Sequence, residues 1–167
     1  MLRRCCLLTI VLLSLFSLWG HTSAQAQDRF RVYLGTYTDD GSQGIYQCEF
    51  NAKDGSISPV TLAAKTNSPS FLAFHPNGKF MVAVNERDAM VSAFAIDAET
   101  GILTFINSQP TQGDAPCHLV VDSAGKNVLV ANYTGGSCIS IPLEVDGSLG
   151  STSSFQQHRG PKKNGHS

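Results

Sequence analysis

Residues 68–85, SPSFLAFHPNGKFMVAVN, and residues 115–132, APCHLVVDSAGKNVLVAN, are two copies of one pattern, and together they decide the fold. The copies agree in their apolar runs, in a central turn and in the polar residue that closes each copy. The matching positions, each 47 residues apart, are Pro69 and Pro116, Gly78-Lys79 and Gly125-Lys126, and Asn85 and Asn132. A period of this length is typical of repeat architectures.

A third, partial copy precedes these two. Residues 34–38, LGTYT, resemble residues 130–134, VANYT, at the end of the later copy. The turn at residues 53–55 lies 46 positions before the turn at residues 99–101. Because several matches keep one register, the sequence indicates repeated units of about 46 residues.

Each repeat has the pattern of strands separated by turns. Short apolar runs alternate with connectors rich in Gly, Asn and Asp, which favour hairpins, and no helical period is sustained after the N-terminal apolar run. The predicted strands are 71–75, 80–85, 91–96, 103–108, 118–122, 127–132, 138–143 and 151–156. Four antiparallel strands per repeat predict a propeller blade, since a β-helix repeats at a shorter period and a sandwich does not repeat internally.

The predicted fold class is therefore all-β, a β-propeller built from four-stranded antiparallel blades. We expect three blades, at approximately 30–66, 67–114 and 115–160, followed by an irregular tail at 161–167. Closed propellers need at least four blades. Three blades form an incomplete ring, so we expect self-association through open blade edges.

The N-terminal 26 residues have the pattern of a signal peptide. Arg3 and Arg4 precede an apolar run at residues 7–19, and Ala24-Gln25-Ala26 supplies a small-x-small cleavage site. The run is shorter than the roughly 20 residues that span a bilayer as a helix. We expect export, periplasmic or secreted, with no membrane contact after cleavage; an uncleaved membrane anchor is the alternative.

Composition excludes several classes of protein. With 42% hydrophobic and 15% charged residues and a net charge of −1, the chain is neither a basic nucleic-acid binder nor a disordered tail. Beyond the signal peptide, Cys48, Cys117 and Cys138 form no C-x-x-C pair, so we expect small apolar strand residues and no metal site. No phosphate-cradling glycine loop is present, and no organic cofactor is expected.

The propeller geometry predicts where a site would lie. The start of a blade's first strand and the end of its second strand share one rim, beside the central channel. The polar residues that we place there as substrate-binding candidates are Tyr37, Asn85, Arg87, Asn132 and Tyr133. His75 falls in a turn at the opposite rim, and we expect it to be solvated.

The same rim motifs carry a resemblance to a known family. Residues 34–38 followed by Gly44-Ile45-Tyr46, then residues 68–73 with Asn85-Glu86, and finally residues 130–136 resemble successive blades of the lactonase family of seven-bladed propellers. The resemblance covers about 31–158. It implies a hydrolase that opens a small sugar-acid lactone in carbohydrate metabolism, of the 6-phosphogluconolactonase type. A lactonising cycloisomerase of the carboxymuconate type is the close alternative.

The resemblance stops short of the whole family pattern. Members have about seven blades, and a Pro-His-x-His motif follows a Gln-His pair in the third blade. Here Gln157-His158 is present, but the motif is not. The resemblance therefore implies a truncated lactonase whose activity is in doubt, and a non-catalytic exported propeller used for binding stays open.

Opening a lactone needs a base that activates water and a donor that stabilises the oxyanion. Glu86 is the base candidate, unless it is only a surface carboxylate paired with Arg87. His118 is a candidate acid or base, unless it faces a neighbouring blade, and His158 is a candidate by its place in the family pattern. The alternative for Asn85, Asn132 and Tyr133 is a repeated turn that ends each blade. A phosphorylated substrate would also require basic or amide groups.

Overall fold

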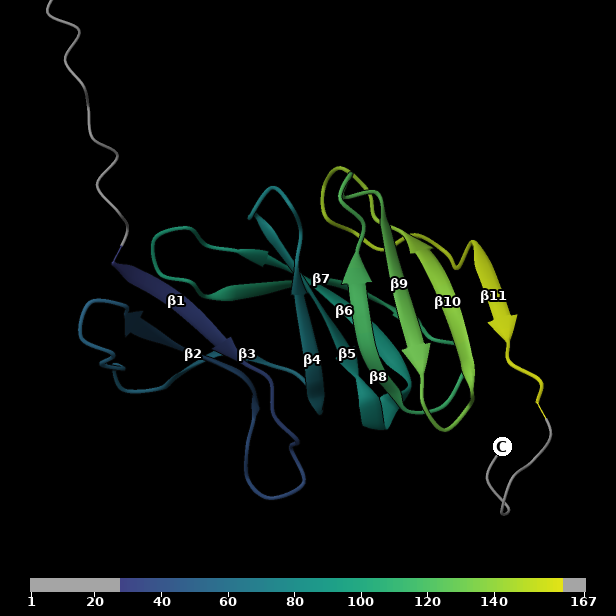
Figure 1. Ribbon diagram of the computed structural model, residues 1–167, viewed down its shortest axis with the longest axis horizontal. Helices are drawn as coiled ribbons and strands as arrows, with labels where there is room; N and C mark the ends of the chain where they lie inside the picture. Colours follow the sequence, from purple (N-terminus) through teal and green to yellow (C-terminus); the bar gives the residue numbers. More distant parts are fainter. Residues whose placement is uncertain (1–27, 161–167) are drawn as a thin grey trace, which may run out of the picture.

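The computed structural model describes residues 28–160, which form strands arranged in three antiparallel sheets (Figure 1). The strands are β1 (Arg29–Leu34), β2 (Gly44–Asn51), β3 (Thr61–Lys65), β4 (Pro69–Phe74), β5 (Phe80–Asn85), β6 (Met90–Ile96), β7 (Leu103–Pro110), β8 (Pro116–Val121), β9 (Asn127–Asn132), β10 (Ser137–Pro142) and β11 (Ser154–Gln157). A single 3-10 turn, η1 (Glu86–Asp88), joins β5 to β6. In this part of the chain, no helix is long or apolar enough to span a membrane. The predicted signal peptide and the tail from 161 lie outside the described residues.

The second and third sheets are four-stranded blades. Their strands follow chain order, β4-β5-β6-β7 and β8-β9-β10-β11, and each strand pairs antiparallel with its neighbour. The predicted strands 80–85 and 127–132 coincide with β5 and β9. The all-β prediction of antiparallel propeller blades is confirmed.

The innermost strands begin two residues earlier than predicted. β4 and β8 start at Pro69 and Pro116, and a register shift follows each proline. Proline lacks an N–H group and is tolerated at the first residue of a strand or beside a bulge. The prediction placed the strand starts at Phe71 and His118, where the apolar runs begin, and therefore missed these irregular first residues.

The first sheet differs from the prediction of four strands. In the described residues it contains three, in the order β1-β2-β3. The end of β1 matches the end of β9 in sequence, so β1 corresponds to the second strand of a blade. One edge of β1 is therefore unpaired in this part of the structure.

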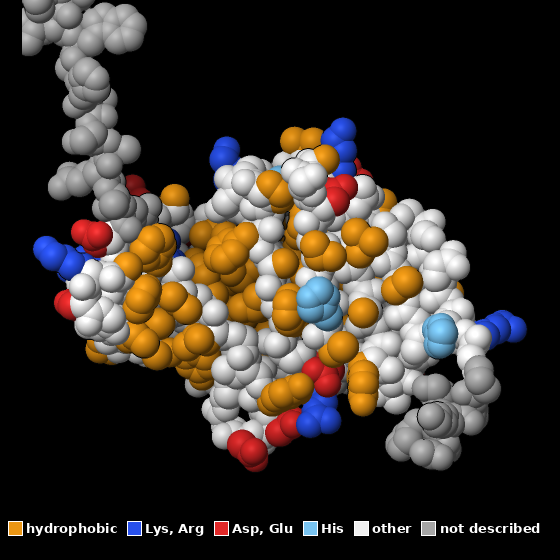
Figure 2. Space-filling view, viewed as in Figure 1, with side chains coloured by type: hydrophobic (Ala, Val, Ile, Leu, Met, Phe, Trp, Pro, Cys, Tyr) orange, Lys and Arg blue, Asp and Glu red, His pale blue; other side chains and the backbone are white. Residues whose placement is uncertain are grey.

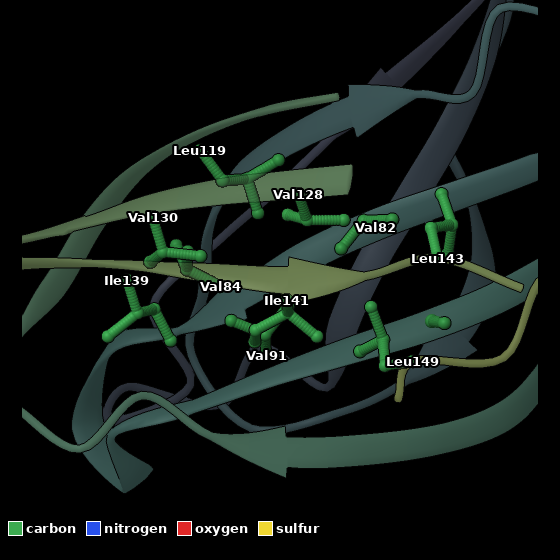
Figure 3. Close-up of a cluster of buried hydrophobic side chains, with 11 residues drawn as sticks. Val82, Val84, Val91, Leu119, Val128, Val130, Ile139, Ile141, Leu143 and Leu149 are labelled. Carbon is green, nitrogen blue, oxygen red and sulfur yellow. The ribbon is translucent and has the colours of Figure 1, made fainter. Parts of the chain in front are cut away.

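Two hydrophobic clusters hold the sheets together. Val82 and Val84 of β5 face the third sheet, where they join Val130 of β9 (Figure 3). Met81 and Ala83, on the opposite face of β5, join a cluster with the first sheet. All four side chains from β5 are fully buried. The second sheet is thus a layer between the other two.

Polar contacts fasten neighbouring sheets at the end where β4 turns into β5. The His75 ring accepts a hydrogen bond from the Asn77 N–H at Nδ1, which leaves Nε2 to donate to the Gly125 carbonyl at 2.9 Å. The ring also meets Phe80 edge-on, with 5.8 Å between centroids. The expectation of a merely solvated His75 is wrong, because the side chain is half-buried and bridges two blades.

Gly125→Ala is expected to destabilise the fold more than Gly78→Ala. Both glycines have left-handed backbones, with φ of +69° and +71°, so each substitution costs about 1–2 kcal/mol in backbone strain. A methyl group at 125 would also lie within 2.3 Å of the His75 ring, whereas position 78 has open space. We expect overpacking to add about 1–3 kcal/mol at 125, measured by urea unfolding.

The double variant His75→Ala/Gly125→Ala identifies the cause of that difference. Removing the ring relieves the clash, so the two substitutions should be strongly non-additive. Equal losses of stability in Gly78→Ala and Gly125→Ala would contradict the bridging role of His75.

Candidate functional site

The predicted rim forms at one end of the sheets. Pro69 pairs with Asn85 and Pro116 pairs with Asn132, which brings the start of each inner strand beside the end of the next strand. The β1–β2 connection lies at the same end (Figure 1). Acidic and basic side chains gather along this lower edge in Figure 2.

Three of the predicted site residues meet between the first and second sheets. The Tyr37 hydroxyl donates to Glu86 Oε2 at 2.8 Å. The Arg87 guanidinium donates to Asp39 Oδ2 at 2.7 Å, and its carbon lies 5.6 Å from the centre of the Tyr37 ring. We call Tyr37, Asp39, Glu86 and Arg87 the rim cluster. Arg87 forms its ion pair with Asp39 and not with Glu86.

A second set of hydrogen bonds positions the rim cluster. The buried Ser68 N–H donates to the Thr38 hydroxyl at 3.2 Å. The Asn67 amide donates to Asp88 at 2.7 Å. These contacts tie both the β1–β2 loop and the η1 turn to the segment that connects the two sheets. The side chains of Tyr37 and Glu86 therefore meet although they are 49 positions apart.

Hydrogen bonds within the rim cluster shift the pKa values of two of its groups, Tyr37 and Arg87. The pKa of Tyr37 is raised, chiefly because its hydroxyl donates to the Glu86 carboxylate. The pKa of Arg87 is raised by its hydrogen bond to Asp39. Tyr37 is thus kept as a proton donor and Arg87 as a cation. The cluster thus places the Tyr37 phenol between the Glu86 carboxyl group, to which it donates, and the Arg87 guanidinium, which lies near its ring.

Asn85 and Asn132 lie inside the fold, each 3% exposed. The Asn85 amide donates to Thr66 Oγ1 at 2.8 Å and accepts from Ser92 at 2.6 Å. The Asn132 amide donates to the Thr111 carbonyl and to Ser137. These side chains hold the segment that leads from the preceding blade by hydrogen bonds, as expected for a repeated residue that ends each blade. They present no surface for the substrate contact that the sequence predicted.

Ser92→Ala is expected to lower the free energy of unfolding by about 1–3 kcal/mol, because it leaves the buried Asn85 Oδ1 without a donor. In the third blade, the residue equivalent to Ser92 is Ile139, 47 positions later, and the equivalent amide oxygen, Asn132 Oδ1, has no hydrogen-bond partner. Ser140→Ala, on a partly exposed position, is the control and should change stability by less than about 0.5 kcal/mol. Equal effects of the two substitutions in urea unfolding would contradict this role for Ser92.

The remaining candidates lie on the third sheet. His118 is exposed, and its ring centre is 4.4 Å from that of Phe71 in β4, so it does face a neighbouring blade. Tyr133 is 80% exposed and holds the position in the third blade that Glu86 holds in the second. His158 follows β11 and borders a hollow of about 460 Å³. Among residues 28–160, these three side chains form no hydrogen bond or ion pair with the rim cluster.

Two further predictions concern cysteines and metals. Cys48 is buried as expected, but Cys138 is exposed because it lies on the uncovered face of the third sheet. All three of these cysteines are free thiols. Within the described range, no group of three His, Cys, Asp or Glu side chains is placed to bind a metal ion.

Residues 31–167 match the family described as Lactonase, 7-bladed beta-propeller. The chain belongs to this family. The chain is 39% identical over 130 residues to the 6-phosphogluconolactonase of Bacillus subtilis, and 32% identical over 123 residues to that of Formosa agariphila. It also superimposes on the periplasmic gluconolactonase of Pseudomonas aeruginosa with a TM-score of 0.72 at 27% identity.

The chain spans less than half the length of these relatives. The match to the Bacillus protein covers 77% of this chain and 37% of that protein. The match to the Formosa protein covers 71% of this chain and 35% of that protein. The Pseudomonas structure is covered to 39% of its length by 78% of this chain. The three sheets therefore correspond to an arc of the seven-bladed family fold.

Proposed function

We propose that the chain acts on sugar-acid lactones as a hydrolase of the 6-phosphogluconolactonase type, with the rim cluster as its reacting site. The observation that carries the proposal is the contact between Tyr37 and Glu86 beside Arg87, at the rim where the family motifs lie. Membership of the lactonase family supports the reaction class. The small-molecule partner is a lactone.

The chemistry follows from the hydrogen bonds of Glu86. Tyr37 occupies Oε2, which leaves Oε1 to take a proton from water as the water oxygen attacks the lactone carbonyl. The carbonyl oxygen becomes an oxyanion, and the Arg87 guanidinium supplies N–H donors and positive charge beside it. When the ring C–O bond breaks, the proton on Glu86 passes to the leaving ring oxygen. The product is an open-chain hydroxy acid, and Glu86 is again a carboxylate.

Glu86→Gln is expected to lower kcat/KM for lactone hydrolysis by about 100-fold or more, because the amide cannot take a proton from water. Glu99→Gln is the matched control, since Glu99 is exposed in the β6–β7 turn at the other end of the same sheet. Tyr37→Phe should give a smaller loss, because Glu86 keeps its carboxylate. The rates are measured by proton release, with the uncatalysed rate subtracted.

Other outcomes of this assay favour the alternatives. Full activity in Glu86→Gln would contradict the role of Glu86 as base. Ring closure of an unsaturated diacid without lactone hydrolysis would favour the cycloisomerase. Lactone binding without either reaction would favour the non-catalytic binding propeller.

We also propose that residues 1–26 direct export and are then removed. The basic, apolar and small-x-small segments of the sequence support this. N-terminal sequencing of the exported protein should begin at Gln27, and Arg3→Glu/Arg4→Glu should reduce export. A full-length chain retained in membranes would instead identify an anchor.

We further propose that the open faces of the arc associate with a second copy. Val120 and Leu129 of the third sheet are 47% and 48% exposed, whereas Ala73 and Val82, the equivalent residues of the second sheet, pack against the next blade. The first sheet presents its own apolar face, including the exposed Phe30, at the other end of the arc (Figure 2). A second copy can therefore repeat the contact that already joins successive blades.

Leu129→Asp is expected to convert an associated wild-type chain into a monomer, because it places a charge in the centre of that face. Val145→Asp is the control, since Val145 is 99% exposed in a turn. Sedimentation velocity measures the masses. A monomeric wild-type chain would contradict the association.

A further inference from the structure

A polar hollow lies at the end of the third sheet where β10 begins and β11 ends (Figure 1). We call it the β10–β11 hollow. Its volume of about 460 Å³ is within the usual range for small-molecule pockets. The side chains that line it are those of Asn132, Ser137, Cys138, Gln156, Gln157 and His158. None of them is a carboxylate, lysine or arginine, and Arg159 does not line the hollow. Because a charged ligand would lose hydration there without meeting a counter-charge, the lining favours a neutral ligand.

The equivalent place in the second sheet is apolar. The residues 47 positions before Ser137, Cys138 and Gln157 are Met90, Val91 and Pro110. The backbone is nevertheless the same in both sheets. The N–H groups of Thr111 and His158, also 47 positions apart, each donate at 2.9 Å to the carbonyl just before the third strand of their blade. A blade therefore ends in this way without polar side chains, and the blade itself does not require those of the hollow.

Asn132 and Ser137 present an acceptor and a donor side by side in the hollow. The Asn132 amide donates to Ser137 Oγ at 3.0 Å, which leaves the Ser137 O–H free to donate to another group. Among the described residues, Asn132 Oδ1 has no hydrogen-bond partner although it is buried. A buried acceptor without a donor is unfavourable. One hydroxyl group of a ligand can donate to Asn132 and accept from Ser137 through the same oxygen.

Gln156, Gln157 and His158 add hydrogen-bonding groups on the exposed side of the hollow. Gln157 Nε2 donates to the carbonyls of Gly135 and Gly136 at 2.8 and 3.0 Å, which fixes its amide and leaves Oε1 as an acceptor. The exposed Gln156 amide and His158 ring can each donate and accept. Donors and acceptors that alternate over a short distance are complementary to the neighbouring hydroxyl groups of a sugar ring.

We propose that the β10–β11 hollow binds a neutral saccharide through its hydroxyl groups, at a site separate from the rim cluster. The two sites share no residue, and His158 forms no hydrogen bond or ion pair with the rim cluster. The proposal therefore does not depend on the lactonase reaction, and either proposal can fail alone.

The exposed thiol of Cys138 reports whether the hollow is occupied. Cys138 lines the hollow, whereas Cys117 on β8 does not. The test measures, by mass spectrometry of the full chain, how fast iodoacetamide alkylates each thiol as maltose is added at constant protein concentration. We expect maltose to slow the alkylation of Cys138 several-fold with saturation, and to leave Cys117 unchanged. No effect at Cys138, or equal slowing of both thiols, would overturn the site.

Two variants test the residues that carry the proposal. Ser137→Ala removes one hydrogen bond to the ligand and should raise the maltose concentration for half-maximal protection about two- to tenfold. His158→Ala should have a similar effect, and its exposed position makes a folding defect an inadequate explanation. Ser140→Ala, on the same strand but outside the hollow, is the matched control and should leave protection unchanged. Protection as in the wild type in both Ser137→Ala and His158→Ala would contradict the proposal.

Two other results would overturn one part of the proposal each. Protection by N-acetylglycinamide and not by maltose would overturn the saccharide and identify an amide ligand. Loss of maltose protection in Glu86→Gln would overturn the separation of the two sites, because Glu86 belongs to the rim cluster.

Discussion

The burial of the second sheet on both faces is the constraint on which the rest of the structure depends. Val82 and Val84 pack towards the third sheet, while Met81 and Ala83 pack towards the first. Burying one large aliphatic side chain contributes about 1.5–3 kcal/mol, whereas solvent screens an exposed ion pair such as Arg87–Asp39 and leaves it little net effect. Apolar stacking therefore sets the positions of the blades. The rim cluster forms where the stacked blades bring two loops together.

The sequence was sufficient to predict the blades because the repeat places the apolar runs and the turns at equivalent positions in successive blades. The two strands that end in Asn85 and Asn132 were predicted to the residue. The irregular starts of β4 and β8 were missed, since the bulge after each proline has no apolar signature. The bridging role of His75 was also missed. Its partner is a backbone carbonyl 50 positions away, and no side chain in the sequence marks that contact.

The sequence predicted the location of the candidate site at the strand ends, but it did not distinguish the side chains that are buried there from those that are accessible. Asn85 and Asn132 occur at the same point of their repeats and are buried, whereas the residues that follow them are half-buried (Glu86) or exposed (Tyr133). The repeated residue maintains the blade, and the residue after it varies between the blades. The sequence analysis proposed the buried asparagines and the residues that follow them as site residues alike. Asp39 was not named, because its pairing with Arg87 depends on how two blades stack.

The order of the strands within each sheet has a consequence for how the arc opens. Every strand pairs with its sequence neighbour, so each sheet can form from local hairpins, and the sheets then interact only with the next one along. In such a one-dimensional array the ends separate first. Amide hydrogen exchange should therefore be slowest along β5, faster in β1 and β11, and graded between them. Because the η1 turn with Glu86 and Arg87 follows β5 directly, we expect it to stay in place while the outer strands open.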